Sequence, residues 1–298
     1  MDGRRKEKDV MKHCKTNDGM KKTRGDRLAC AIILSIVSIF ILFPFYWMIK
    51  TSLTPSAEIM MSPPLWIPSR TAWENYQLVW SSIPLMRYLG NSMLTAGLGA
   101  VLGMMLSTSA SFSLACFKSR IRIPALVLFL FTQLIPFTLP FVSFYMMMFN
   151  ARLTNTYEGL IIAYCVWSIP YCTLTMRGYF TQALPTELLE SARIDGCSRF
   201  GMYWRIGLPL VLPALVATVI FAFINGWNDF VWASVMLADN RKKTAAIGIY
   251  DYVGQYGQNA NKALQMTTAV LITLPIIVLF GFLQKHLVSG LTAGAVKG

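Results

Sequence analysis

Charged side chains are scarce in this sequence: they make up 14% of its 298 residues, whereas hydrophobic residues make up 55%. A chain of this length that folds in water needs more polar surface, so this composition argues against a soluble globular protein. Long apolar runs with few charges are instead typical of a protein that crosses a membrane several times. Histidine is also rare, with two residues in the whole chain. They stand far apart, and we predict no metal site.

Motifs of enzymatic chemistry are missing as well. No GxxxxGK[ST] phosphate-binding loop occurs, and no nucleophile lies beside a candidate base. The six cysteines include no CxxC pair, and most lie in apolar segments. This favours small buried side chains over a disulfide framework or a zinc site. We therefore expect neither enzymatic activity nor a cofactor in this chain, and a membrane-embedded enzyme is the least favoured class.

Acidic residues are outnumbered by basic ones, 14 to 27, which gives a net charge of +13. Ten of the basic residues fall within positions 1–27, and most others lie in short loops. That distribution is typical of cytosolic flanks on a membrane protein and argues against nucleic-acid binding. We predict that residues 1–27 form a cytosolic basic tail without a packed core. Its sequence is compatible with a start at Met1, Met11 or Met20.

Six apolar segments follow, each long enough to cross a bilayer as a helix. The hydrocarbon core offers backbone polar groups no partner but one another, so the predicted fold is an all-α polytopic membrane protein. The membrane domain spans residues 28–289, and both termini lie in the cytosol. The predicted spans are 28–49, 91–117, 123–149, 159–176, 208–225 and 266–283. Pro136 and Pro140 predict a bend in the third span.

Small residues recur at every fourth position of the second span. Such a ridge lets another helix approach closely, so we predict that it serves packing. Its members are Thr95, Gly99, Gly103, Ser107, Ser111 and Ala115.

Ionisable side chains are absent from the middles of all six predicted spans. Ion- or proton-coupled carriers generally need such groups at membrane depth. An ion-coupled secondary carrier of a small polar solute therefore remains only as the alternative function. The basic run Arg241-Lys242-Lys243 falls in a predicted outer loop, which opposes the usual excess of positive charge inside.

A polar segment, 177–207, separates the fourth and fifth spans. Pro185 suits the first position of a helix, Gly196 suits a left-handed stop, and Ser198 can cap a second short helix. The pattern predicts an amphipathic element at the mouth of the bundle with one face free for a partner. An ordinary cytosolic connector is the alternative.

This segment resembles the EAA loop of bacterial ABC importer permeases, in which the loop docks the ATPase subunit. The resemblance rests on the spacing of Glu190, Ser191, Ala192, Gly196, Ile206, Leu208 and Pro209. Ser191 departs from the motif, because it stands at the central alanine. The last residues, 290–298, closely resemble the C-terminus of maltose-type, oligosaccharide-transporting permeases. The resemblance covers about residues 28–298.

The resemblance implies a fold of six transmembrane helices with a cytosolic coupling loop, in a bacterial inner or plasma membrane. It implies a permease subunit that carries an oligosaccharide without hydrolysing ATP. The expected partners are a second permease subunit, two ATPase subunits that hold ATP and Mg, an extracytoplasmic sugar-binding protein and membrane lipid. The candidate coupling residues are Glu190, Ala192, Asp195, Gly196, Ile206, Leu208 and Pro209.

Candidate sugar contacts follow from this expectation. Aromatic rings pack against the C–H faces of sugars, and amides bond their hydroxyls. Tyr164, Trp167 and Tyr171 share one face of the fourth span, so we predict that they line the sugar path with Gln133. A packed or lipid-facing stripe is the alternative.

Two further segments receive roles by resemblance. In the outer loop, Gln255, Tyr256, Gly257 and Gln258 are candidate contacts for the binding protein. The glycine-containing C-terminal cytosolic tail, 290–298, is expected to be extended and to reach between the ATPase subunits.

Overall fold

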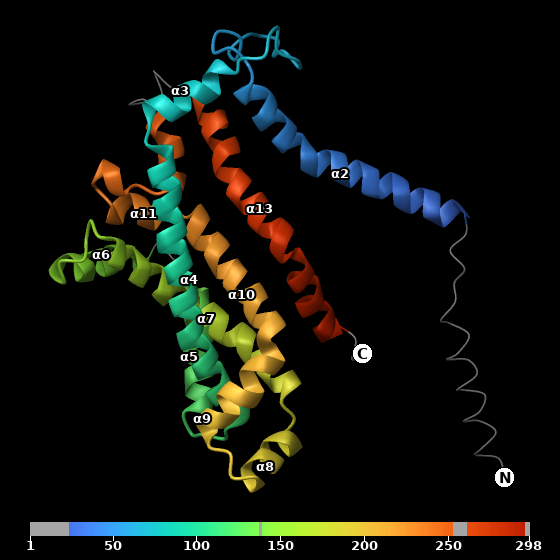
Figure 1. Ribbon diagram of the computed structural model, residues 1–298, viewed down its shortest axis with the longest axis vertical. Helices are drawn as coiled ribbons and strands as arrows, with labels where there is room; N and C mark the ends of the chain where they lie inside the picture. Colours follow the sequence, from blue (N-terminus) through green and yellow to red (C-terminus); the bar gives the residue numbers. More distant parts are fainter. Residues whose placement is uncertain (1–23, 137–138, 253–260, 296–298) are drawn as a thin grey trace. The chain divides into compact units, whose positions relative to one another are not determined.

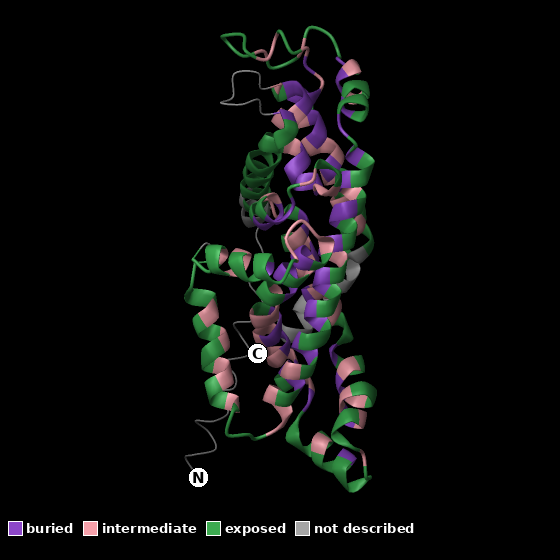
Figure 2. Ribbon diagram, turned by 90° about the vertical axis from the view of Figure 1, so that its left-hand side faces the viewer, coloured by how far each residue is buried: buried purple, intermediate pink, exposed green. Residues whose placement is uncertain are grey.

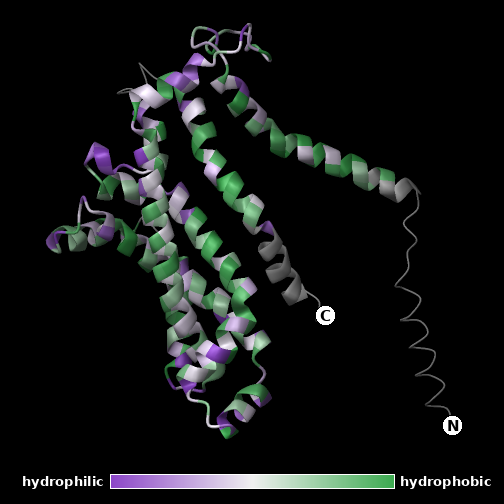
Figure 3. Cartoon of the chain, in the orientation of Figure 1, coloured by the Kyte–Doolittle hydropathy of each residue, from purple (hydrophilic) through white to green (hydrophobic). Residues whose placement is uncertain are grey.

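The computed structural model describes residues 24–136, 139–252 and 261–295, which form helices and turns with no strand among them. The chain divides into two compact units, residues 1–50 and 51–298. The described part of the first unit is most of α2 (Arg24–Ser52), along which hydrophobic residues predominate (Figure 3). From Ile32 to Tyr46 every side chain is exposed. A helix that is apolar all round and uncovered is typical of a membrane span.

The second unit is built around one long helix, α4. It packs against both α7 and α10, and α10 also packs against α13 (Figure 1). Buried residues gather where these helices meet, and exposed residues cover their outer sides (Figure 2). The elements are α3 (Glu74–Ser82), α4 (Leu85–Cys116), α7 (Tyr157–Ala183), α10 (Leu208–Asn228) and α13 (Lys262–Ala295). Five helical segments of the described residues are long and apolar enough to cross a membrane, and they lie in α2, α4, α7, α10 and α13.

The third predicted span is not a continuous helix. It consists of α5 (Arg122–Leu134) and α6 (Phe141–Asn150), of 13 and 10 residues. At 1.5 Å per residue they reach about 20 and 15 Å, short of the ~30 Å hydrocarbon core. Pro136 and Pro140 lie in the break between the two helices. Neither has an N–H to donate, so the helix is interrupted here and not merely bent. The predicted count of six continuous spans is therefore not confirmed.

The small-residue ridge of α4 is the face that packs against α7, as predicted. A Cβ at Gly99 would lie 2.7 Å from Cβ of Tyr164, and a Cβ at Gly103 would collide with a side chain of α7. Further along, Ser111 Oγ donates to the carbonyl of Thr173 at 2.9 Å. Close approach of the backbones fixes the position of α7, which provides one wall of the site described below.

The chain breaks after α10 and begins a new short helix. α10 continues to Asn228, and α11 (Val231–Met236) begins after Asp229. The Asp229 carboxylate accepts hydrogen bonds from the N–H of Trp232 at 3.3 Å and of Ala233 at 2.9 Å. These bonds satisfy two of the free N–H groups that any helix presents at its start.

The segment after α11 accommodates its basic run by pairing each cation. Arg241 forms an ion pair with Asp239, Lys243 forms one with Asp251, and Lys242 donates to a backbone carbonyl. Two of the three positive charges are therefore balanced locally, and the third has a backbone acceptor. The helices here are η2 (Asn240–Lys242), α12 (Ala245–Gly248) and η3 (Ile249–Tyr252).

Between α7 and α10 the chain forms three short elements, α8 (Thr186–Ile194), α9 (Arg199–Met202) and the π-helical η1 (Tyr203–Gly207). Gly196 has φ +77°, so the predicted left-handed stop is confirmed. The predicted cap of the second helix is also confirmed, because Ser198 Oγ accepts the N–H of Gly201 at 3.1 Å. Pro185 precedes α8 as its cap, one position earlier than predicted.

The extended backbone predicted for 290–298 is wrong for its first six residues, because α13 continues through Ala295. Gly290 and Gly294 lower helix propensity by about 1 kcal/mol each relative to alanine, which does not by itself end a helix. The last three residues lie outside the described part of the chain.

Candidate functional site

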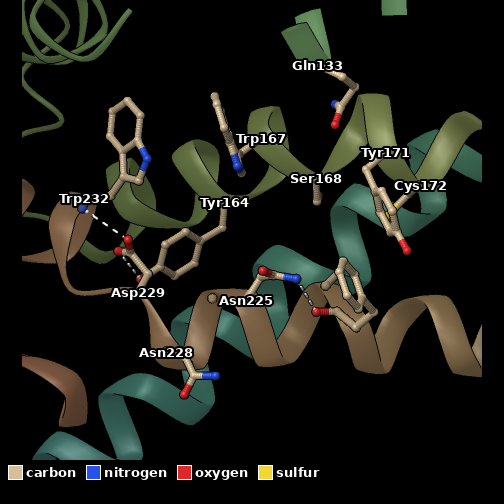
Figure 4. A pocket seen from close by; sticks show the side chains of 13 residues that line it. Gln133, Tyr164, Trp167, Ser168, Tyr171, Cys172, Asn225, Asn228, Asp229 and Trp232 are labelled. Atoms are coloured by element: carbon tan, nitrogen blue, oxygen red, sulfur yellow. Dashed lines mark hydrogen bonds between the residues drawn. The ribbon is translucent and has the colours of Figure 1, made fainter. Parts of the chain in front are cut away.

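A cavity of about 520 Å³ lies among α5, α7, α10 and α11 (Figure 4). The four candidate path residues, Gln133, Tyr164, Trp167 and Tyr171, all line it. The structure thus brings together residues from two helices, and their role in transport stays a prediction. The other lining residues are Ser168, Cys172, Phe221, Ala222, Asn225, Gly226, Asn228, Asp229 and Trp232.

The three aromatic residues of α7 differ in how far they open to the cavity. Trp167 is 44% exposed and Tyr171 37%, whereas Tyr164 is only 8% exposed. Two glycines hold the ring of Tyr164 in place: a Cβ at Gly99 or Gly226 would lie within 3.2 Å of its side chain. Tyr164 is therefore a packed wall of the cavity, and Trp167 and Tyr171 offer the accessible ring surface.

Aromatic pairs stand at two ends of the cavity (Figure 4). The rings of Trp167 and Trp232 lie 6.4 Å apart at one end, and those of Tyr171 and Phe221 lie 4.6 Å apart at the other. The pairs join α7 to α11 and α7 to α10 respectively. Flat apolar faces at both ends suit a ligand with C–H surfaces of its own.

Amide side chains supply the polar groups between these rings. Asn225 donates to the carbonyl of Phe221 at 2.8 Å (Figure 4). The amides of Gln133 and Asn228 make no hydrogen bond to another described residue, and both side chains are exposed. Neutral amides can donate and accept, so they match the hydroxyls of a polar, uncharged ligand.

One carboxylate, Asp229, belongs to the cavity wall. Besides the two backbone donors of α11, it accepts a hydrogen bond from the hydroxyl of Tyr164 at 3.1 Å. Asp229 lies directly after the membrane-crossing part of α10. Burial raises the pKa of its carboxyl, and the donated hydrogen bonds act in the opposite direction. The bonds fix both oxygens, so the position of this charge is set by the fold.

Sequence reasoning missed the contribution of α10 and α11 to this cavity. Asn225, Asn228, Asp229 and Trp232 are not among the predicted path residues. A polar cluster directly after an apolar helix is the signal that points to them.

The candidate coupling residues lie in the segment 190–209, called the coupling segment below after its predicted role, and they form an inner and an outer set. Ala192 is buried against the end of the bundle, and Ile206 and Leu208 are half-buried in the same cluster, so their side chains pack inside this chain. The other four candidates, Glu190, Asp195, Gly196 and Pro209, are exposed. Three of the seven candidates therefore pack within this chain, and four are open to solvent or a partner.

The exposed side of this segment is available to a partner. Within the described part of the chain, Glu190 makes no hydrogen bond or ion pair, and a Cβ at Gly196 would have nothing within 4 Å. Two apolar side chains, Ile194 and Phe200, are 87% and 72% exposed beside them. The sequence analysis did not single out these two residues, and their signal is an apolar side chain among polar neighbours.

Two further predictions concern the binding-protein contacts and the absence of a metal site. The candidate binding-protein contacts 255–258 lie outside the described residues. Among the residues that are described, no group of three or more His, Cys, Asp or Glu could hold a metal ion.

Comparison with known proteins places this architecture among transport proteins. Residues 99–293 match the family model described as "Binding-protein-dependent transport system inner membrane component". The diacetylchitobiose uptake system permease protein DasC of Streptomyces coelicolor is 31% identical, over 94% of this chain and 100% of the relative. The trehalose/maltose transport system permease protein MalG of Thermococcus litoralis is 34% identical, over 91% of this chain and 97% of the relative.

A solved structure has a similar fold. It is a bacterial ABC transporter involved in the import of the acidic polysaccharide alginate, and one of its chains matches with a TM-score of 0.71 at 20% identity. The match covers 88% of this chain and 98% of that chain. These similarities do not favour an ion-coupled secondary carrier.

Proposed function

Because this chain belongs to the family of binding-protein-dependent transport system inner membrane components, we propose that it is the permease subunit of an ATP-driven importer for an oligosaccharide. It crosses the membrane and provides part of the path for the solute. The chain itself is not an enzyme.

The cavity is the observation that carries the choice of a sugar. Its volume of about 520 Å³ falls in the range of about 300–1,000 Å³ typical of small-molecule sites. Its walls combine accessible aromatic rings, Trp167 and Tyr171, with the neutral amides of Gln133 and Asn228. Rings for C–H faces and amides for hydroxyls are the combination that a sugar needs. The names of the relatives, which include a diacetylchitobiose and a trehalose/maltose permease, agree with this choice.

Energy for transport comes from partners in this proposal. Two ATPase subunits hold ATP and Mg, and this chain pairs with a second permease subunit. An extracytoplasmic binding protein delivers the sugar. The exposed residues of the coupling segment, above all Glu190 and Gly196, face the ATPase. ATPase closure then rocks the two permease bundles against each other.

Orientation follows from the same arrangement. The coupling segment and both chain ends lie in the cytosol of a bacterial cell, and the segment 238–262 lies outside. Lipid covers the exposed apolar sides of α2, α10 and α13. Gln255 to Gln258 then lie on the side from which the binding protein approaches.

The proposal is tested by purifying the tagged chain from its native membrane in mild detergent and identifying the proteins that accompany it. We expect a P-loop ATPase and a second, different membrane subunit. The purified assembly, placed in proteoliposomes with ATP, should accumulate a labelled oligosaccharide only when the binding protein is supplied.

A matched variant separates transport from assembly. Trp167→Ala removes an accessible ring of the cavity without touching the coupling segment. It should leave the accompanying ATPase in place and reduce sugar uptake at least about tenfold, which corresponds to about 1.4 kcal/mol. Purification without any ATPase would contradict the proposal, as would uptake that does not depend on ATP.

A further inference from the structure

The cavity contains one formal charge, and that charge is negative. Among its thirteen lining residues there is no Lys, Arg or His, and Asp229 is the single acidic residue. All the other polar side chains of the wall are neutral amides, hydroxyls, two indoles or a thiol. The electrostatic character of this wall therefore depends on Asp229.

The surroundings of Asp229 suit an ionised carboxylate. Its oxygens receive three hydrogen bonds, from the hydroxyl of Tyr164 and the N–H groups of Trp232 and Ala233. All three partners donate, and an ionised carboxylate is a pure acceptor. A protonated carboxyl would add a further donor, and none of these three groups accepts a hydrogen bond from it in this arrangement. These hydrogen bonds favour the charged form and act against burial, which raises the pKa of the Asp229 carboxyl.

No cation of the described lining compensates this charge. The basic residues nearest in sequence are Arg241, Lys242 and Lys243, and all three have partners elsewhere. Arg241 and Lys243 form ion pairs with Asp239 and Asp251, and Lys242 donates to the carbonyl of Asn155. An anionic solute next to Asp229 would meet a like charge in a confined, partly apolar space. Coulomb repulsion is stronger there than in water, because the effective dielectric constant is lower.

We propose that this cavity discriminates by charge: it accepts neutral or cationic oligosaccharides and disfavours anionic ones, with Asp229 as the residue that sets the preference. The inference rests on the proposed function, because it names the class of sugar for the same cavity. It does not follow from the shared fold, since a solved structure of this fold belongs to an importer of an acidic polysaccharide.

The test measures binding to the purified importer complex in nanodiscs, without the binding protein, by isothermal titration calorimetry. The probes are three trisaccharides that differ in charge: maltotriose, fully deacetylated chitotriose and trigalacturonate. We expect trigalacturonate to bind at least about tenfold more weakly than maltotriose, equal to about 1.4 kcal/mol. Chitotriose should bind at least as tightly as maltotriose.

Two variants assign the effect to this site. Asp229→Asn keeps an oxygen that can accept from the α11 N–H groups and removes the charge, so it should abolish most of the difference between maltotriose and trigalacturonate. Asn228→Asp adds a second carboxylate at an exposed lining position, where folding is not at stake, and should widen that difference.

The outcomes separate this inference from the function it rests on. Equal or tighter binding of trigalacturonate overturns the charge preference and leaves the sugar importer standing. A preference that neither variant changes overturns the role of Asp229. Failure of all three trisaccharides to bind, in a complex that contains its ATPase, counts against both the sugar cavity and its charge preference.

Discussion

At the scale of single residues, two glycines of α4 have very different surroundings. A Cβ at Gly99 would lie 2.7 Å from Cβ of Tyr164, which cannot move without shifting α7, whereas a Cβ at Gly97 would have nothing within 4 Å. Alanine at either position gains the same helix propensity. We expect Gly99→Ala to be less stable than Gly97→Ala by about 1–3 kcal/mol, the range for overpacked cores.

Thermal unfolding of the two purified variants in the same detergent measures this difference. Gly97→Ala serves as the control, because it adds the same methyl group to the same helix. Equal melting temperatures would show that α4 and α7 are not packed as closely as the backbone positions indicate. Gly99→Ala should also weaken sugar binding, because Tyr164 is a wall of the cavity.

Gly196 is the second informative position, since it combines φ +77° with open space around its Cβ. An ordinary residue in this conformation costs about 1–2 kcal/mol, and aspartate tolerates it better than alanine. Strain within the chain therefore predicts that Gly196→Ala is the worse variant. A docked ATPase predicts the reverse, because aspartate is larger and charged. We expect Gly196→Asp to reach the membrane normally, lose sugar uptake and bind the ATPase more weakly.

The measurement compares three quantities for both variants: the amount in the membrane, the ATPase that co-purifies and the rate of uptake. Normal transport by Gly196→Asp would remove the claim that this turn faces the ATPase. Greater damage from alanine would assign the effect to backbone strain alone.

At the scale of elements, we predict which positions in the middle of α7 are accessible to water. Trp167 and Tyr171 line the cavity, and Val166 is 51% exposed but does not line it. Single cysteines at these positions, in a background without native cysteines, should differ in their reaction with a small water-soluble thiol reagent. Cysteines at 167 and 171 should react, and one at 166 should not, because lipid covers that side.

A cysteine at 164 adds the conformational part of this test. Tyr164 is buried in the present structure, so its replacement should react slowly. Alternating access predicts that labelling at 164, 167 and 171 changes between nucleotide-free and ATP-trapped complexes. Three positions that stay inert in both states would place the stripe in lipid or in the packed core, the alternative interpretation of its spacing.

Elements with a strong local signal could be predicted from the sequence. Small residues at every fourth position of α4 identified the face against α7, and a single glycine identified the turn after α8. Both signals act through backbone geometry, which depends on few neighbours. The aromatic stripe of α7 was likewise visible from helical spacing alone.

Elements that depend on competition between signals could not be predicted. Apolar length favoured one helix across 123–149, whereas two prolines separate α5 from α6. The glycines near the C-terminus argued against a helix that α13 nevertheless continues. The share of α10 and α11 in the cavity was also hidden, because it depends on which helices meet in three dimensions.

The π-helical segment η1 has no counterpart among the elements predicted from the sequence. The N–H of Leu208 bonds to the carbonyl of Tyr203, one residue further back than in an α-helix. Pro209 follows and has no N–H to offer to the carbonyl of Arg205, so regular bonding cannot continue through this point. The hydroxyls of Tyr203 and Thr108 lie 2.8 Å apart, which ties the segment to α4. A proline in the first turn of a helix does not by itself predict this widening.

At the scale of the whole molecule, the C-terminal end separates membrane insertion from coupling. The apolar part of α13 that can cross a membrane ends at Phe282, so residues 291–298 lie beyond it. Deleting these eight residues leaves the insertion signal intact, because that signal depends on the apolar span. If the end reaches between the ATPase subunits, as in the permeases it resembles, the deletion should reduce uptake severalfold more than it reduces the amount of protein in the membrane.

A replacement of the same length sharpens this last test. Exchanging residues 291–298 for glycine and serine keeps the length of the chain and removes its specific side chains. Both variants should accumulate in membranes at similar levels and retain less ATPase than the unmodified chain after purification. Uptake by the replacement but not by the deletion would mean that length alone matters. Uptake at the normal rate by both would identify the end as a terminus without a role in coupling, since termini commonly tolerate change.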